Sequence, residues 1–221
     1  MFKKFLLSLL TIATLSTTVM AQTNTNYGVG LKLSTLGIGL DLIKPINDSF
    51  ALRLNINGAS YSENDVESGI NYDYDLTLVT AGLLIDYYPL ESAFRVSAGA
   101  YYNANEYKLK ALTTDSLYEI AGNYYTTEQV TSINGLMEFD TLSPYVGIGW
   151  GRTPKPKEWN FSIDVGVLYH GAPSVELSAQ CGAVDCDKLQ QDIAQEQQEL
   201  LNVTKDYTIY PLISVGLSYA F

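Results

Sequence analysis

Histidine, cysteine and basic residues are scarce in this chain. Its 221 residues contain one histidine and two cysteines, and 13 lysines and arginines stand against 24 aspartates and glutamates. The net charge of −11 excludes nucleic acid as an expected partner, because an acidic protein repels a polyanion. Any histidine-dependent enzyme chemistry would have to use His170, the single histidine.

Long apolar runs are also missing. No stretch reaches the ~18–20 consecutive apolar residues of a membrane helix, so a membrane-spanning mature chain would have to be a closed β-barrel. The first 21 residues carry Lys3 and Lys4, a short apolar run and a small-residue site ending at Ala21. This pattern predicts a cleaved secretory signal peptide over residues 1–21, followed by one domain over residues 22–221. No cysteine lies near the cleavage site, so a lipoprotein anchor is not expected.

The mature chain alternates large apolar residues with small or polar ones at a period of two, which is typical of strands with unlike faces. Eight segments show this pattern: 26–33, 36–45, 50–61, 73–89, 94–109, 136–150, 158–170 and 207–221. The connections between them alternate in length. They are short at 46–49, 90–93 and 151–158, and long at 62–72, 110–134 and 172–206. This arrangement predicts an all-β fold, an eight-stranded antiparallel transmembrane barrel with short periplasmic turns, long extracellular loops and one short loop helix.

The first two segments leave an alternative open. The apolar parity changes between Leu33 and Leu36, which requires either a turn at Ser34-Thr35 or a bulge in one long strand. A single strand would give an odd count of seven, which single-chain bacterial barrels avoid. We therefore predict the turn, with Leu36 in the outward apolar row.

Aromatic residues gather at the predicted periplasmic end of the apolar row. Seven of the eight strands contribute one: Tyr27, Phe50, Tyr87, Phe94, Trp150, Trp159 and Phe221. Aromatics at one level and on one face are typical of a membrane-interface girdle. A soluble sheet has no reason to align them.

The C-terminal Tyr219-Ala220-Phe221 carries a family resemblance. A terminal aromatic with another two residues before it is similar to the signal read by the barrel-assembly machinery. In this and in its strand pattern the mature chain resembles the small eight-stranded outer-membrane barrels of the OmpA, OmpX and OmpW type. Residues 94–107 and 139–151 also resemble an uncharacterised group of proteobacterial barrel proteins. The resemblance implies the bacterial outer membrane and a single-chain barrel, and it transfers no activity.

The predicted lumenal row contains seven charged or titratable residues: Lys32, Asp41, Arg53, Asp86, Arg95, Asp164 and His170. Counting across the short turns places Asp86 opposite Arg95, and Asp41 nearly opposite Arg53. Charges in a narrow lumen must be paired, and eight strands leave an interior just wide enough for side chains. The favoured interpretation is a polar plug, with glycines making room for inward tyrosines. A selective or narrow pore is the alternative.

An enzyme is the least favoured interpretation. Some eight-stranded barrels modify lipid A with a histidine, a serine and an acid, and here His170 precedes Ser174. Asp164 lies six residues before His170, about 20 Å at ~3.3 Å per residue, which is too far to orient the imidazole. We therefore predict no catalytic residues, no cofactor and no metal site.

The loops carry three further predictions. Cys181 and Cys186 are expected to form a disulfide, as an even cysteine pair does in an exported protein. Residues 187–202 have the apolar spacing of a helix that Asp185 or Asp187 caps. A hairpin is expected at Ala121-Gly122-Asn123. The loops are acidic, which indicates a solvated surface or, more specifically, cations shared with lipopolysaccharide phosphates.

These observations predict a monomeric, non-enzymatic outer-membrane barrel with a role in envelope structure or surface interaction. Its expected partners are outer-membrane lipid, lipopolysaccharide and, during biogenesis, the assembly machinery. The alternative function is a narrow channel for small or hydrophobic molecules.

Overall fold

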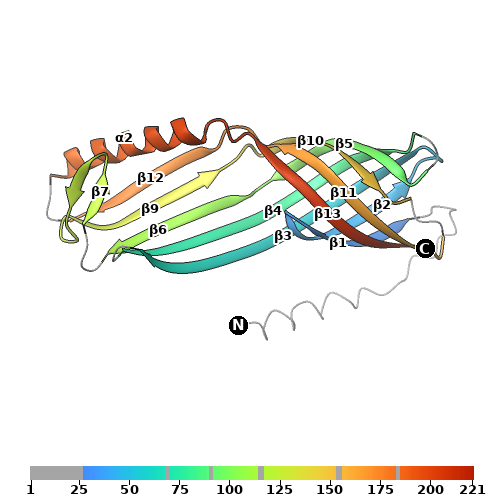
Figure 1. The fold of residues 1–221 in the computed structure, drawn as a ribbon, viewed down its shortest axis with the longest axis horizontal. Helices are drawn as coiled ribbons and strands as arrows, with labels where there is room; N and C mark the ends of the chain where they lie inside the picture. The colour runs from blue at the N-terminus through green and yellow to red at the C-terminus, as the bar shows by residue number, and fades with distance from the viewer. Residues whose placement is uncertain (1–26, 68–69, 90–91, 114–116, 153–155, 183–184) are drawn as a thin grey trace.

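The computed structural model describes residues 27–221 apart from 68–69, 90–91, 114–116, 153–155 and 183–184 (Figure 1). The predicted signal peptide lies outside the described residues. Among those described, no helix has the length and apolarity needed to cross a membrane.

Within the described residues, eight antiparallel strands close into a ring. They are β1 (Gly28–Ser34), β2 (Gly37–Pro45), β3 (Phe50–Glu67), β4 (Ile70–Tyr87), β5 (Phe94–Asn103), β10 (Leu142–Trp150), β11 (Trp159–Tyr169) and β13 (Ile209–Ala220). The order around the ring is β1-β2-β3-β4-β5-β10-β11-β13, and β13 pairs back onto β1. The predicted eight-stranded barrel is confirmed at this level.

The turn between β1 and β2 resolves the open alternative. Ser34 pairs with Gly37, and the two strands form a hairpin rather than one bulged strand. Leu36 differs from its predicted position: it is fully buried inside the barrel instead of lying in the outward row. Leu36 lies in the turn itself, before β2 begins, so it does not belong to the outward row of that strand.

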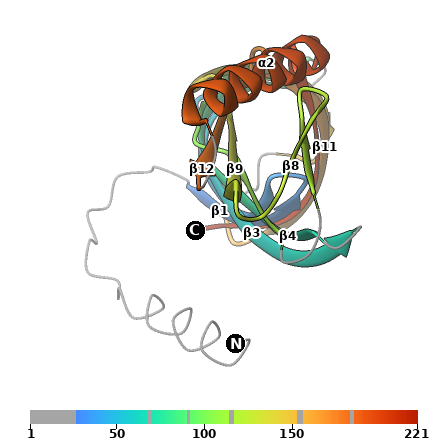
Figure 2. The same cartoon turned by 90° about the vertical axis from the view of Figure 1, so that its left-hand side faces the viewer.

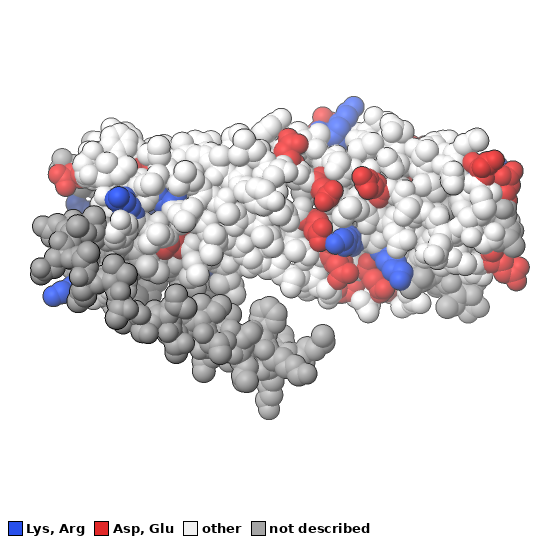
Figure 3. Space-filling model, turned by 180° about the vertical axis from the view of Figure 1, so that it is seen from behind, with Lys and Arg blue, Asp and Glu red and all other residues white. Residues whose placement is uncertain are grey.

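The two faces of the ring differ as the alternation predicts. Along β10 every second residue is buried, and the intervening apolar residues are exposed. Val165 on β11 and Val215 on β13 leave 51% and 42% of their surface uncovered. The outside of the barrel is therefore an apolar belt, and Figure 3 shows it as a largely uncharged band beside the charged far end of the molecule.

Three barrel strands continue beyond short breaks. β6 (Glu106–Thr113) follows β5, β9 (Val130–Glu138) precedes β10, and β12 (Ser174–Cys181) follows β11. With the far halves of β3 and β4 they form one sheet in the order β3-β4-β6-β9-β12. We call this sheet, its covering helix and its small hairpin the distal lobe. The opposite end, which contains the C-terminus, is the girdle end (Figure 1).

The segments predicted as long loops therefore contain strands that were not predicted, at 62–67, 70–72, 110–113, 130–134 and 174–181. The period of two persists there: the exposed Lys110 is followed by the buried Ala111, and the exposed Glu176 and Ser178 alternate with Val175 and Leu177. A strand with one charged face and one packed face resembles a solvated loop when only its charges are counted.

The packed face of the lobe forms a second hydrophobic core. Helix α2 (Cys186–Thr204) lies along β12, and the hairpin of β7 (Tyr118–Ile120) and β8 (Asn123–Tyr125) closes the end (Figure 2). Leu189 and Ile193 of α2 pack with Tyr118, Ile120 and Val130. The predicted hairpin is confirmed, and its turn residues Ala121 and Gly122 both have positive φ, as a type I′ turn requires.

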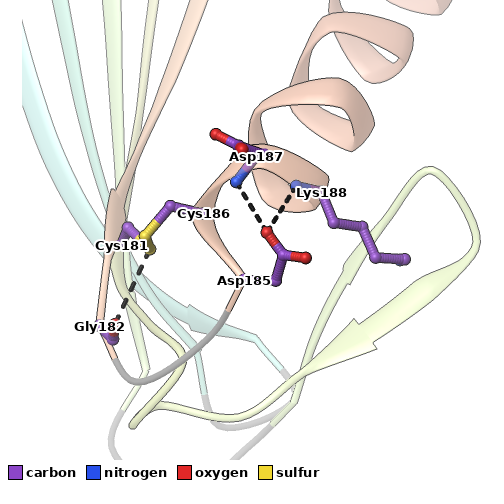
Figure 4. The surroundings of a disulfide bond; sticks show 6 residues. All are labelled: Cys181, Gly182, Asp185, Cys186, Asp187 and Lys188. Carbon is purple, nitrogen blue, oxygen red and sulfur yellow. Dashed lines mark hydrogen bonds between the residues drawn. A yellow bond between two sulfur atoms is a disulfide. The ribbon is translucent and has the colours of Figure 1, made fainter.

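A helix cap and a disulfide both fix the start of α2. The Asp185 carboxylate accepts hydrogen bonds from the backbone N–H groups of Asp187 and Lys188, which caps the helix. The disulfide between Cys181 and Cys186 ties the end of β12 to the first helical residue (Figure 4). The predicted disulfide is confirmed.

A polar contact attaches the hairpin to the helix. The Tyr125 hydroxyl and the Lys188 ammonium both donate to Asp192, the latter over 3.0 Å. These hydrogen bonds hold the pKa of the Asp192 carboxyl below its usual value.

Candidate functional site

The barrel interior carries a layer of six ionisable side chains, each from a different strand. Lys32, Arg53 and Arg95 supply three positive charges, and Asp41, Asp86 and Asp164 supply three negative ones. All six lie at inward positions of their strands, and none is more than 7% exposed. We call this set the ionic layer. Its formal charge is zero.

Arg53 is the centre of the layer. Its guanidinium lies 2.7 Å from Asp86, 3.4 Å from Asp164 and 4.0 Å from Asp41, and it donates to the Ser97 hydroxyl. Lys32 completes the set through a 3.0 Å contact with Asp41. Since isolated charges are heavily penalised in such a site, the layer persists only because each charge has a partner.

Arg95 binds Asp164 with both carboxylate oxygens engaged. Its Nη2 lies 2.7 and 2.9 Å from the two oxygens, and its Nε donates over 3.1 Å. Gly149 stands between the two residues in the sheet, opposite both Arg95 and Asp164. A Cβ at Gly149 would collide with the Asp164 carboxylate, so the glycine opens the path across β10.

Of the two predicted charge pairs, Asp86 with Arg95 differs in the structure, and Asp41 with Arg53 is present as a long contact. Asp86 was expected opposite Arg95, but the ladder places it opposite Ser97, and its ion pair is with Arg53. Asp41 was expected nearly opposite Arg53, and the two lie 4.0 Å apart; Asp41 is closer to Lys32, at 3.0 Å, and it accepts from Asn55 over 2.6 Å. The turn-based count was wrong by two residues for β4 and β5. The two ion pairs of Asp164, with Arg53 and with Arg95, join strands that are not neighbours in the sequence.

An apolar layer lies beside the ionic layer, towards the distal lobe. Leu84, Tyr101, Tyr145, Leu168 and Leu212 are buried there together with Leu36. Tyr101 and Tyr145 meet edge to face, 5.7 Å apart. A Cβ on Gly147 or Gly166 would collide with the Tyr145 hydroxyl, so glycines make room for this ring as the sequence predicts.

Little space remains around the charges. A cavity of about 10 Å³ borders Asp41, Arg53 and Arg95. A volume of that size holds at most one water molecule. On the girdle side, Tyr88, Ile43 and Ala51 form a further buried cluster. Among the described residues, side chains therefore fill the lumen in three consecutive layers: this cluster, the ionic layer and the apolar layer.

The predicted aromatic residues lie together at the girdle end. Phe50 stacks on Tyr87 at 4.9 Å, Phe94 lies opposite Trp150, and Trp159 contacts Tyr219 at 5.0 Å. The ring is completed at the chain ends, where the backbone N–H of Phe221 donates to the carbonyl of Tyr27. Most of these side chains are exposed on the outer face; Trp159 and Phe221 leave 69% and 72% of their surface open.

Comparison with solved structures gives the kind of protein that shares this architecture. The chain is similar to CarO2 of Acinetobacter baumannii, with 26% identity over 90% of this chain and 100% of that one, and a TM-score of 0.60. CarO of the same organism matches at 25% identity over 88% and 97%, with a TM-score of 0.57. Both are outer-membrane barrel proteins. The fold is that of an outer-membrane barrel.

Other comparisons add less. A major outer membrane protein of Thermus thermophilus matches at 15% identity over 90% of this chain and 100% of that one, with a TM-score of 0.47. No family model and no curated protein matches the chain. The likeness to the OmpA, OmpX and OmpW type stays a prediction.

His170 lies where the barrel passes into the distal lobe. Its ring contacts Phe139 at 4.4 Å and Tyr210 at 6.4 Å and is 6% exposed. The Ser174 hydroxyl donates to the carbonyl of Glu138, and Asp164 is engaged by two arginines. Among the described residues, no hydrogen bond joins His170 to either one.

Proposed function

We propose that this protein spans the bacterial outer membrane as a barrel closed to solutes, and that it carries its distal lobe on the cell surface for interaction. The ionic layer carries this proposal. Six mutually neutralising side chains fill the cross-section where a channel would have to pass, and the apolar layer fills the section next to it.

The outer wall supports the membrane-spanning part. Strand β11 has 11 residues, which is the length of a tilted transmembrane strand, and its apolar row extends from Trp159 to Tyr169. An exposed aliphatic surface of this extent is stable only against lipid or a partner. The aromatic girdle marks one interface, and the charged face of the lobe begins at the other.

Closure of the lumen predicts the absence of conductance. The purified wild-type protein, reconstituted in a planar lipid bilayer, should show no discrete current steps, while a general porin in the same bilayer does. Opening a path would require separating buried ion pairs at a cost of several kcal/mol per ion. Reproducible single-channel steps from the wild-type chain would contradict closure and would favour the alternative of a narrow channel.

The C-terminal aromatics suit an assembly signal. Tyr219 and Phe221 meet edge to face at 5.2 Å on the outer surface of the closing strand, where both rings are accessible before the barrel closes. We expect Phe221→Ala to lower the amount of folded protein in outer-membrane fractions several-fold, and Phe221→Trp to restore it. Refolding of purified Phe221→Ala in detergent should be near normal. A comparable loss in vitro would assign the residue to stability instead.

The other expected partners follow from the same placement. Lipopolysaccharide surrounds the wall below the lobe, and the barrel needs no second copy to bury its lumen. No cofactor, metal or catalytic role forms part of the proposal.

A further inference from the structure

The sheet of the distal lobe has one edge without a strand partner. The ladder between β2 and β3 ends where Ile38 pairs with Gly58. β3 continues for nine more residues, Ala59 to Glu67, and pairs there with β4 alone. In Figure 1 β3 forms the outer margin of the lobe. Residues 59–66 are all exposed. We call residues 59–66 the β3 edge.

The backbone groups that point outward can be identified from the ladder. Phe50 accepts from Ile46 on the β2 side, whereas Ser49 accepts from Tyr88 on the β4 side. Because this direction alternates with each residue and the β3–β4 register is unbroken, even-numbered residues direct their N–H and C=O groups away from β4. Beyond Gly58 these are Ser60, Ser62, Asn64 and Val66. The Val66 N–H is taken by the Asp65 carboxylate at 2.8 Å. Among the described residues, the outward groups of Ser60, Ser62 and Asn64 have no partner strand.

The opposite edge of the same sheet is protected. Helix α2 lies along β12, and Gln197 accepts a hydrogen bond from the Leu177 backbone N–H over 3.1 Å. Proteins usually blunt exposed edges with lysine, proline or a bulge. The β3 edge has none of these, and its ladder contains no register shift. It is an exposed, unbroken strand edge on which another strand could pair.

The charge around the β3 edge determines which kind of strand can bind there. Residues 59–75 include five acidic residues and no lysine or arginine. Glu63 and Asp65 lie on one face of the β3 edge, and Asp73 and Asp75 lie on the other face of the neighbouring strand. A second copy of this chain would bring like charges together across the new ladder, which is unfavourable. Asp73 and Asp75 lie opposite Lys110 and Lys108 of β6, so the carboxylates that a basic strand would meet are those of Glu63 and Asp65, on one face of the edge.

We propose that the β3 edge binds an extended, lysine- or arginine-rich segment of another polypeptide as an added β-strand. Main-chain hydrogen bonds to Ser60, Ser62 and Asn64 supply the affinity, and the acidic residues supply the selectivity. The inference rests on the proposed display of the lobe at the surface. Its test in detergent gives the same answer whether or not the barrel conducts, so the two proposals can fail separately.

The test titrates the full-length protein in detergent micelles against a fluorescein-labelled ten-residue peptide of alternating lysine and threonine, followed by fluorescence anisotropy. We expect saturable binding that weakens with salt and is absent for the matching glutamate–threonine peptide. A peptide with alternate backbone nitrogens methylated along one side should bind at least about tenfold more weakly, the loss expected from one or two hydrogen bonds.

Two substitutions at Ser62 separate the contribution of its outward backbone N–H from that of its side-chain hydroxyl. Ser62→Pro removes an outward N–H without touching the β4 ladder, as edge positions tolerate. Ser62→Ala keeps the N–H and loses only the hydroxyl contact with Asp75. We expect Ser62→Pro to weaken binding about tenfold and Ser62→Ala to leave it near wild type.

Several outcomes would overturn the inference. These are no saturable binding of the lysine–threonine peptide, equal binding of its methylated form, or equal binding by wild type and a folded Ser62→Pro. Equal binding of the glutamate–threonine peptide would also overturn the inference. A wild-type dimer that Ser62→Pro dissociates would assign the edge to self-association instead. If Ser62→Pro fails to fold, the methylated peptide still decides the question.

Discussion

Asp164→Asn should be among the most destabilising single substitutions in the barrel. Asp164 is 2% exposed, binds Arg95 through both oxygens, contacts Arg53 at 3.4 Å and accepts from Ser214 at 3.3 Å. Neutralising it leaves two buried arginines to share Asp86 and Asp41, and the layer gains a net positive charge. Removing one partner of a buried ion pair costs about 3–5 kcal/mol. The urea midpoint for unfolding from lipid vesicles should fall accordingly.

Two further variants make the result specific. Asp206→Asn removes the same charge from an exposed residue after α2 and should shift stability by no more than ~0.5 kcal/mol. Adding Arg95→Met to Asp164→Asn restores neutrality, so the double variant should recover much of the loss. If Asp164→Asn unfolds at the wild-type urea concentration, the ionic layer does not hold the barrel together.

The sequence was sufficient for the strands but not for their connections across the lumen. Alternation of period two identifies which side chains of β4, β5 and β11 point inward, so Asp86, Arg95 and Asp164 could all be placed in the interior. Their partners depend on the register and on the tilt of strands in a closed ring. That tilt brings Arg95 across Gly149 to β11, a contact between residues 69 positions apart. Gly149 is the one local signal, and its meaning is visible only once both neighbours are known.

The distal lobe was missed for a different reason. Lys110 and Glu176 suggest solvated loops, yet they lie on the exposed face of strands whose other face packs beneath α2. Ala111, next to Lys110, and Leu177, next to Glu176, carried the signal of a packed face. The helix was located to within two residues at each end, because its cap and disulfide are local features. The packing of α2 along the edge strand β12 depends on tertiary structure, which no local sequence pattern specifies.

Val215→Arg tests the membrane-spanning belt directly. Val215 lies midway along β13 with its side chain in the outer apolar row, opposite Leu33 and Ile163, and 42% of its surface is open. In lipid, an arginine at the midplane of a barrel wall costs ~2–4 kcal/mol. We expect a loss of that size when unfolding by urea is followed in lipid vesicles.

The matched control makes the same substitution outside the belt. Val203 on α2 is 69% exposed, more open than Val215, so Val203→Arg should change stability by less than ~0.5 kcal/mol. If the belt faced water, the two variants would behave alike, since neither removes a packed core residue. A clear loss for Val215→Arg with none for Val203→Arg requires a solvent that excludes charge around β13. Equal, small effects would mean that the apolar wall is covered by something other than lipid.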